Sequence, residues 1–171
     1  ASVAGISPEK MERYYSEHRL RFFQPKRVRL QQIMLKPVTG ETPEIMAQTA
    51  QSIIRRLEKG TSFEELAKKY SQDSSAERGG HCGWLSEKDL IGELSLVAFG
   101  LQKGQSSSPL QVGEKIFILK AVDTHPERIQ PLEEVREKIE AAVVKEESML
   151  TYKRWMDGLR KEAFVTRQLD R

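Results

Sequence analysis

The fold is decided by a stretch that reads SFEELAKKYSQDSSAERGGHCGWL over residues 62–85, continues with AFGLQKGQ over residues 98–105, and reaches Pro109-Leu110. Ser62 predicts the N-cap of an amphipathic helix, with Glu65 three residues later as its reciprocal capping partner. A polar turn follows, then a glycine loop of the pattern Gly-Gly-x-x-Gly-Trp at residues 79–84, a second apolar helix and a turn at Gly104. These motifs in this order form a more specific signal than any one of them alone.

This order of motifs resembles the core of the parvulin family of peptidyl-prolyl isomerases. The generic pattern there is a helix that ends in FxELAxxYSxD, a GGDLGW loop and a later AFxLxxGxxSxPV segment. The resemblance implies an α+β fold in which helices cover a small, largely antiparallel sheet. We expect strands at residues 28–36 and 115–122 near the centre of the sheet, and helices at about 43–59, 62–70 and 89–99.

Long apolar helices are predicted on both sides of this core. Ser7-Pro8-Glu9 predicts a helix start, and Pro131 predicts the start of a helix that runs to about residue 160. A short closing strand is expected at 163–165. The two flanks resemble the modules that bracket the isomerase domain in SurA- and PrsA-type extracytoplasmic chaperones. Because a further helical segment normally precedes the first flank there, we expect the chain to be part of a longer protein. The expected organisation is a chaperone flank at 1–26, a parvulin-like domain at 27–124 and a second flank at 125–171.

The flanks carry more large apolar side chains than isolated helices can leave in water. We expect the 131–160 helix to dock against the helix that starts at Pro8, or to bury its apolar stripe in a second copy of the chain. The residues that carry this expectation are Met11, Tyr14, Tyr15, Phe22 and Phe23 on one flank, and Trp155, Met156 and Leu159 on the other.

Composition and charge exclude several classes of function. Of the 171 residues, 38% are hydrophobic and 31% charged, as is typical of globular domains. No apolar run approaches the roughly 20 residues that cross a bilayer. Residues 1–36 are basic, but without an RNA-binding aromatic signature or a phosphate-cradling glycine motif we expect no nucleic-acid partner. A single cysteine, Cys82, excludes an intramolecular disulfide and a thiolate cluster, and we expect no metal and no cofactor.

The resemblance also implies a site. Parvulins are thought to use a polar basin with two histidines and a Cys or Asp, and the matching positions here are Gln32, Asp73 and Phe117. Both histidines are therefore replaced, by Gln32 and Phe117, while the acidic position is kept. The glycine-loop aspartate falls on His81, which we expect to face solvent. The positions implied for substrate binding are Cys82, Leu90, Ile91, Leu94 and Phe99.

Each of these residues also has a purely structural interpretation. Gln32 could be a strand residue that satisfies a neighbour, and Asp73 could cap its loop. Leu90, Leu94 and Phe117 could be ordinary core residues that also touch the pocket. Cys82 fits a small pocket hydrophobe better than a reactive thiol.

Three functions remain open at this point. The first is a weakly catalytic parvulin-type isomerase domain of a periplasmic or otherwise extracytoplasmic chaperone, which binds proline-containing segments of unfolded or nascent polypeptides. The second is a non-catalytic holdase that keeps a degenerate parvulin domain as a peptide-binding module. In the third, the flanking helices form a homodimer and the middle domain is a spacer.

Overall fold

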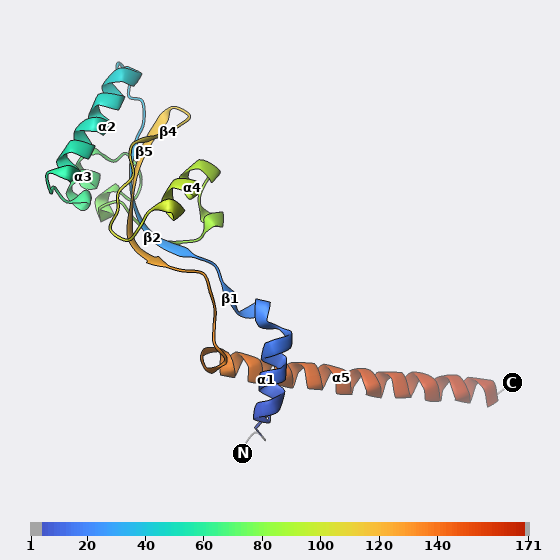
Figure 1. The fold of residues 1–171 in the computed structure, drawn as a ribbon. Coiled ribbons are helices and arrows are strands. Elements are labelled where there is room, and N and C mark those ends of the chain that lie inside the picture. Colours follow the sequence, from blue (N-terminus) through green and yellow to red (C-terminus); the bar gives the residue numbers. More distant parts are fainter. Residues whose placement is uncertain (1–4, 170–171) are drawn as a thin grey trace. The chain divides into compact units, whose positions relative to one another are not determined.

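The computed structural model describes the backbone of residues 5–169 and the side chains of residues 5–165. The chain forms two compact units, one from the segments up to Gln24 and from Ile129, the other from Pro25–Arg128. Figure 1 labels their elements. Within the described part of the chain, no helix combines the length and apolarity that crossing a bilayer requires.

A four-stranded antiparallel sheet forms the centre of the second unit, in the order β3-β2-β5-β4. Its strands are β2 (Arg27–Leu35), β3 (His81–Leu85), β4 (Leu110–Val112) and β5 (Lys115–His125). The two predicted strands are the two central ones, β2 and β5, so the expected α+β fold is confirmed. β5 extends to His125, three residues beyond the predicted end.

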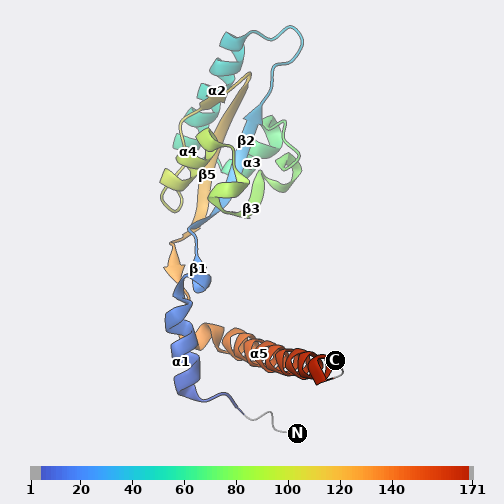
Figure 2. The same cartoon turned by 90° about the vertical axis from the view of Figure 1, so that its right-hand side faces the viewer.

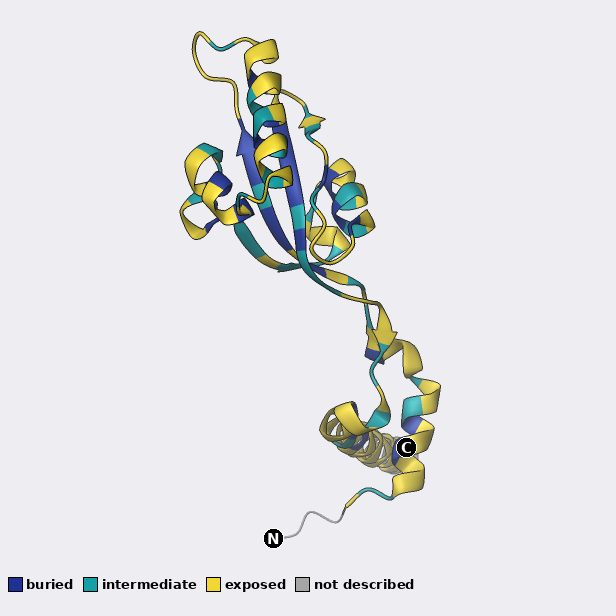
Figure 3. Ribbon diagram, turned by 60° about the vertical axis from the view of Figure 1, so that its left-hand side comes forward, coloured by how far each residue is buried: buried dark blue, intermediate teal, exposed yellow. Residues whose placement is uncertain are grey.

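Helices cover both faces of this sheet (Figure 1). On one face, α2 (Pro43–Glu58) and α3 (Phe63–Tyr70) pack on Ile33, Leu35 and Ile118. On the other, α4 (Gly92–Gly100) packs on Val28, Leu30 and Met34. Successive side chains of a strand point to opposite faces, and helices on both faces therefore bury most of β2 and the first half of β5 (Figure 3).

The predicted helix starts follow from their caps. Ser62 Oγ accepts a hydrogen bond from the backbone N–H of Glu65 at 3.1 Å, and the Thr42 and Ser7 side chains cap α2 and α1 in the same way. The helix predicted at 89–99 begins later, at Gly92. Ser86 and Asp89 form a capping box at the start of a separate 3-10 helix, Glu87–Asp89. Ile91 is then the N-cap of α4.

In the other unit, α1 (Pro8–Glu17) packs on the first turns of α5 (Leu132–Leu169), as Figures 1 and 2 show. A 3-10 helix at Arg19–Phe22 follows α1, and β1 (Phe23–Gln24) pairs with β6 (Arg128–Ile129) in a two-stranded sheet. The expected docking of the long helix on the helix from Pro8 is therefore confirmed for its first third. The buried residues of this contact are Met11, Tyr14, Phe22, Val135, Ile139 and Val143.

The closing strand predicted at 163–165 is wrong, because these residues continue α5. Phe164 and Val165 favour strands, but the residues before them, Lys161-Glu162-Ala163, are strong helix formers. No proline interrupts the helix after its start. A helix that is already formed adds residues at little cost, so local strand preference does not end it.

Two glycines, one just before β3 and one within it, differ in how closely they approach the neighbouring backbone. Gly80 and Gly83 both have φ of +79°, where an L side chain is strained by about 1–2 kcal/mol. A Cβ at Gly80 would also collide with the carbonyl oxygen of Gln32, whereas a Cβ at Gly83 would meet nothing within 4 Å.

We therefore predict that Gly80→Ala lowers the free energy of unfolding by about 1–3 kcal/mol more than Gly83→Ala, the matched control. Urea unfolding followed by circular dichroism measures both. Equal losses in the two variants would show that the close approach of Gly80 to β2 does not constrain the sheet.

Candidate functional site

Two of the three predicted catalytic positions act on each other. Gln32 lies on β2, and hydrogen bonding from its side chain contributes to the lowered pKa of Asp73, in the loop after α3. Phe117 lies on β5 opposite Met34, and both pack in the apolar cluster beneath α4. Because Gln32 and Met34 are two residues apart on one strand, Gln32 points to the same face of the sheet as this cluster. The fold thus places Gln32 and Asp73 next to the apolar cluster beneath α4, whose surface we call the apolar wall.

The Asp73 carboxylate is held in place by its own loop. Its Oδ2 accepts hydrogen bonds from the backbone N–H of Ser75 at 2.9 Å and from the Ser75 hydroxyl. Partial burial raises the pKa of Asp73, but hydrogen bonds from Ser75, Gln32 and the Ser74 backbone outweigh it and leave the pKa below its usual value. Asp73 therefore caps its loop, as the structural interpretation expected, and also presents a fixed negative charge to Gln32.

Ser75 is a site residue that the sequence analysis did not single out. Only 3% of its surface is exposed, and it contacts both Asp73 and Cys82. A signal was available in the sequence, since an Asp in a turn often hydrogen-bonds the backbone N–H two residues on, which for Asp73 is that of Ser75.

Cys82 is a half-buried thiol whose surroundings disfavour its charged form. It is the extra residue of a β-bulge, since Leu30 pairs with Gly83 and Gln31 with His81. Its Sγ–H points to the carbonyl oxygen of Gly80 at 3.4 Å. Burial raises the pKa of the thiol, and the nearby charge of Asp73 raises it further, against opposing contributions from Ser75 and Arg78. A thiol of this kind is a poor nucleophile.

The implied substrate-binding residues do not all lie together. Leu94 and Phe117 are buried in the cluster beneath α4, and Cys82, Leu90 and Phe99 pack against it half-buried. Ile91 is different, because 67% of its surface is exposed at the start of α4. The half-buried members form the accessible part of an apolar wall, and Ile91 follows one of them, Leu90, in the chain.

His81 does not lie in a solvent-facing loop, so that expectation is wrong. It is the first residue of β3 and is partly buried on the α2–α3 face of the sheet. Gln31 donates from Nε2 to the carbonyl oxygen of Gly79 at 3.0 Å, which fixes the orientation of its amide. The second contact of Nε2, at 3.1 Å to His81 Nε2, then makes that ring nitrogen an acceptor. His81 belongs to β3 and not to the loop because it pairs with Gln31 of β2.

The chemistry open to this arrangement is non-covalent. Gln32 can donate and accept hydrogen bonds, Asp73 can accept them, and Phe117 supplies apolar surface where parvulins have an imidazole. Among the described residues, no three His, Cys, Asp or Glu side chains are grouped as metal ligands would be.

The lowered pKa of Asp73 predicts an acid-sensitive contribution to stability. A carboxyl whose pKa is lower in the folded chain stabilises the fold above the unfolded-state value of about 3.9, and this stabilisation is lost as the pH falls through the folded-state value. Asp73→Asn should therefore lower the free energy of unfolding at pH 7. The difference in this free energy between the variant and the unmodified chain should decrease as the pH falls below about 4.

Thermal unfolding between pH 2.5 and 7 measures this difference. Asp157→Asn, at an exposed position of α5, is the matched control. A difference between Asp73→Asn and the unmodified chain that is the same at all these pH values would contradict the assigned hydrogen bonds.

Comparison with known proteins agrees with this geometry. The family model of the PPIC-type PPIase domain, a rotamase, matches residues 32–123. The foldase protein PrsA of a Geobacillus species is 32% identical over 139 residues, which cover 81% of this chain and 44% of that protein. The chaperone SurA of Nitrosospira multiformis is 30% identical over 115 residues, 67% of this chain and 26% of that one. The chain thus spans less than half the length of these relatives.

The fold of the chain also matches solved structures. A SurA-like chaperone of Campylobacter jejuni superposes with a TM-score of 0.69 and 21% identity, over 91% of this chain and 62% of that one. This similarity concerns the fold. Since the family model covers more than half of the residues, including Gln32, Asp73 and Phe117, the chain belongs to the PPIC-type, parvulin family of peptidyl-prolyl isomerases.

Proposed function

We propose that this chain binds proline-containing segments of unfolded polypeptides and catalyses their prolyl isomerisation weakly, as part of an extracytoplasmic folding chaperone. The observation that carries the proposal is the position of Gln32, on the same face of the sheet as the apolar wall beneath α4 and near Asp73. The relatives support the setting, because they are named as a foldase and as chaperones. One of the structurally similar chaperones is described as a periplasmic protein, which supports the extracytoplasmic location.

The reaction needs no covalent step. Rotation about a peptide bond breaks its resonance, at a cost of about 18–20 kcal/mol. A catalyst lowers this barrier by binding the twisted amide more tightly than the planar one. In the proposed site, Leu90, Cys82 and Phe117 hold the proline ring, and the Gln32 amide meets the polar atoms of the twisted bond. Asp73 is the positioning residue that keeps the Gln32 side chain in one orientation.

Replacement of both parvulin histidines makes this catalysis weak. Phe117 has no polar atom, and it is 8% exposed within the apolar cluster. Gln32 retains a donor and an acceptor but never carries a charge. Gln32, positioned by Asp73, is therefore the one uncharged polar side chain at the three catalytic positions. Other parvulins have two histidines there besides the Cys or Asp.

A second candidate function is a holdase without isomerase activity. The same two replacements favour it, because binding of an extended segment needs the apolar wall but not a histidine pair. Many large apolar side chains of α5 are also exposed, among them Trp155, which is 59% exposed. As part of the proposal, this helix joins two copies of the chain into a homodimer.

We predict that isomerase activity on short peptides is low or undetectable, and that Gln32→His combined with Phe117→His increases it. The histidine pair would restore polar groups on both central strands, at positions that face the same side of the sheet. A protease-coupled assay with a proline peptide measures the rate, and circular dichroism checks that the variant is folded.

Gln111→His, at an exposed position of β4, is the control for an added imidazole outside the site. Activity of the unmodified chain equal to that of a parvulin with both histidines would refute the assigned importance of these positions. No gain in a folded double variant would show that the basin lacks a further group.

We further predict that Ile91→Ser weakens binding of a proline-containing peptide by about tenfold. This corresponds to about 1.4 kcal/mol, within what one apolar side chain contributes when a ligand covers it. Fluorescence anisotropy of a labelled peptide measures the affinity. Leu96→Ser is the matched control, because Leu96 is 80% exposed on α4 and is not one of the positions implied for substrate binding. Equal effects of the two variants would remove Ile91 from the proposed site.

A further inference from the structure

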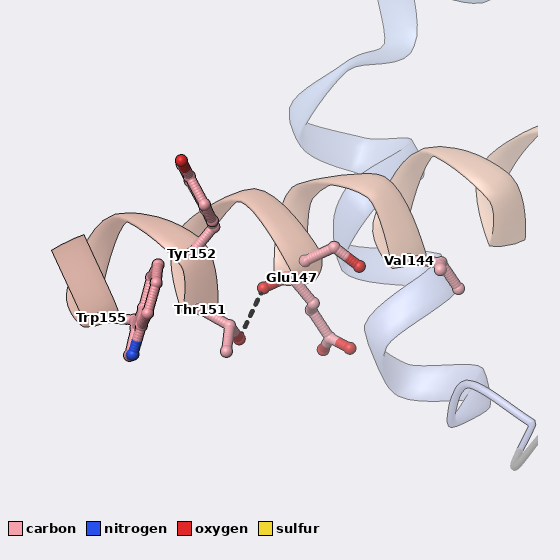
Figure 4. Close-up of a pocket in the computed structure, with 6 residues that line it drawn as sticks. Val144, Glu147, Thr151, Tyr152 and Trp155 are labelled. Carbon is pink, nitrogen blue, oxygen red and sulfur yellow. Dashed lines mark hydrogen bonds between the residues drawn. The ribbon is translucent and has the colours of Figure 1, made fainter.

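A cavity of about 530 Å³ lies on the α2–α3 face of the four-stranded sheet, the face opposite to α4. Separate segments of the chain line it: the strands β2, β3 and β5, the end of α2 with the loop that follows, the first turn of α3, and the segment that holds Gly104 and Ser106. The hollow of about the same volume beside Trp155, shown in Figure 4, is lined by α5 alone. Of the two, the cavity on the sheet has the fixed walls that a specific site requires, because several packed elements hold them.

Four polar residues form one row across the floor of this cavity. Gln31 of β2 pairs with His81 of β3 on one side and with Lys120 of β5 on the other, and a β-bridge joins Lys120 to Ser106. All four residues line the cavity. Side chains directly opposite each other on antiparallel strands point to the same face, with Cβ atoms about 4.5–5.5 Å apart. One small polar group bound on this floor can therefore contact several of these side chains at once.

The side-chain oxygen of Gln31 is a hydrogen-bond acceptor that faces the cavity without a partner. Gln31 is only 5% exposed. Its Nε2 contacts the carbonyl oxygen of Gly79 and Nε2 of His81, whereas no described residue donates to its Oε1. Every fully buried side-chain nitrogen or oxygen in the described part of the chain has a partner, so Oε1 is accessible, and the cavity is the space that Gln31 lines. An N–H group of a ligand can bind this oxygen.

Lys120 supplies a positive charge to the same floor. Its side chain is partly buried, and the ion pairs found among the described residues do not include it. Glu64 also lines the cavity, but its carboxylate pairs with Lys68 at 2.8 Å. The charge that is left without a counter-charge in the lining is therefore that of Lys120. A partly buried ammonium group of this kind favours a ligand with a negative charge.

The first turn of α3 adds hydrogen-bond donors to the cavity. Ser62, Phe63 and Glu64 line it at the N-terminus of this helix. The first N–H groups of a helix have no partner within the helix, and Ser62 Oγ satisfies only that of Glu65. The partial positive charge of a helix N-terminus attracts anions, as Lys120 does. Both features therefore favour the same kind of ligand, a carboxylate.

We propose that this cavity binds one acidic residue, Asp or Glu, of an extended client polypeptide. The carboxylate of this residue binds the Lys120 ammonium group and the N-terminus of α3, and its main-chain N–H donates to Gln31 Oε1. An acidic residue within a peptide has both groups, whereas a small carboxylate anion has no N–H. The site lies on the opposite face of the sheet from the proposed proline site and does not require a proline. It rests on the proposed function only in that the ligand is a polypeptide.

A titration of isotope-labelled chain, followed by NMR, tests the ligand. An alanine peptide with one central glutamate and capped ends should shift the backbone signals of Gln31, His81 and Lys120. The same peptide with glutamine instead should bind about tenfold more weakly, because it lacks the charge. Added salt should weaken binding of the glutamate peptide. Equal binding of both peptides, or shifts centred elsewhere, would overturn the proposal.

Variants of Lys120 test the charge on the protein. Lys120→Gln should weaken binding of the glutamate peptide by about tenfold, whereas Lys120→Arg keeps the charge and should retain most of it. Lys115→Gln, at an exposed position of the same strand outside the cavity, is the matched control. Circular dichroism checks that each variant is folded. Equal affinities of Lys120→Gln and Lys115→Gln would contradict the proposed role of Lys120.

A change in the peptide tests the contact with Gln31. Methylation of the main-chain nitrogen of the glutamate removes the donor for Oε1 and should weaken binding by about threefold. Undiminished binding would contradict this contact. A proline peptide without acidic residues, added to the same labelled chain, keeps the result separate from the proposed function. It should shift signals on the α4 face alone, so either site can fail while the other is observed.

Discussion

The pairing of β2 with β5 is the interaction on which the rest of the larger unit depends. Nine residues of β2 pair with β5, and side chains of these two strands are the middle of both apolar clusters. Ile33 opposite Ile118 faces α2 and α3, and Met34 opposite Phe117 faces α4. A strand pair buried on both faces fixes its register, because a slip by one residue would exchange the two sets of side chains. This register also sets which of two neighbouring glutamines, Gln31 or Gln32, faces the candidate site.

The glycine loop extends that constraint to the polar residues. Gly80 lies against the backbone of Gln32, and its carbonyl oxygen accepts the Gln32 N–H at 2.9 Å. Only a residue without a side chain fits this approach. The loop in turn positions Ser75 and Cys82 beside Asp73. The polar part of the candidate site is therefore held by backbone contacts that do not require the two missing histidines, which explains how the arrangement can persist when those residues have been replaced.

Most of the fold could be predicted from local patterns, and the errors have identifiable causes. Ser62 and Ser7 marked helix starts because a side-chain cap is a short-range interaction. The residue sequence also predicted the strands β2 and β5, since the apolar pattern of a strand is local. His81 was misplaced because its strand assignment depends on pairing with Gln31, fifty residues earlier. Residues 163–165 were misassigned because the helix that precedes them overrides their own preference. In the site, Gln32 and Asp73 were identified by resemblance, whereas their mutual contact and the role of Ser75 depend on how the loop after α3 folds back onto the sheet.

The central claim of this account is that a proline-containing segment binds on the α4 face of the β2–β5 pair. An NMR titration of isotope-labelled chain with a proline peptide, and with the same peptide carrying alanine in place of proline, tests this most directly. The account predicts chemical-shift changes with the proline peptide at Gln32, Asp73, Cys82 and Leu90, much smaller changes with the alanine peptide, and little change at Gln31 and His81 on the opposite face. Changes centred on Gln31 and His81, or equal changes with both peptides, would contradict it.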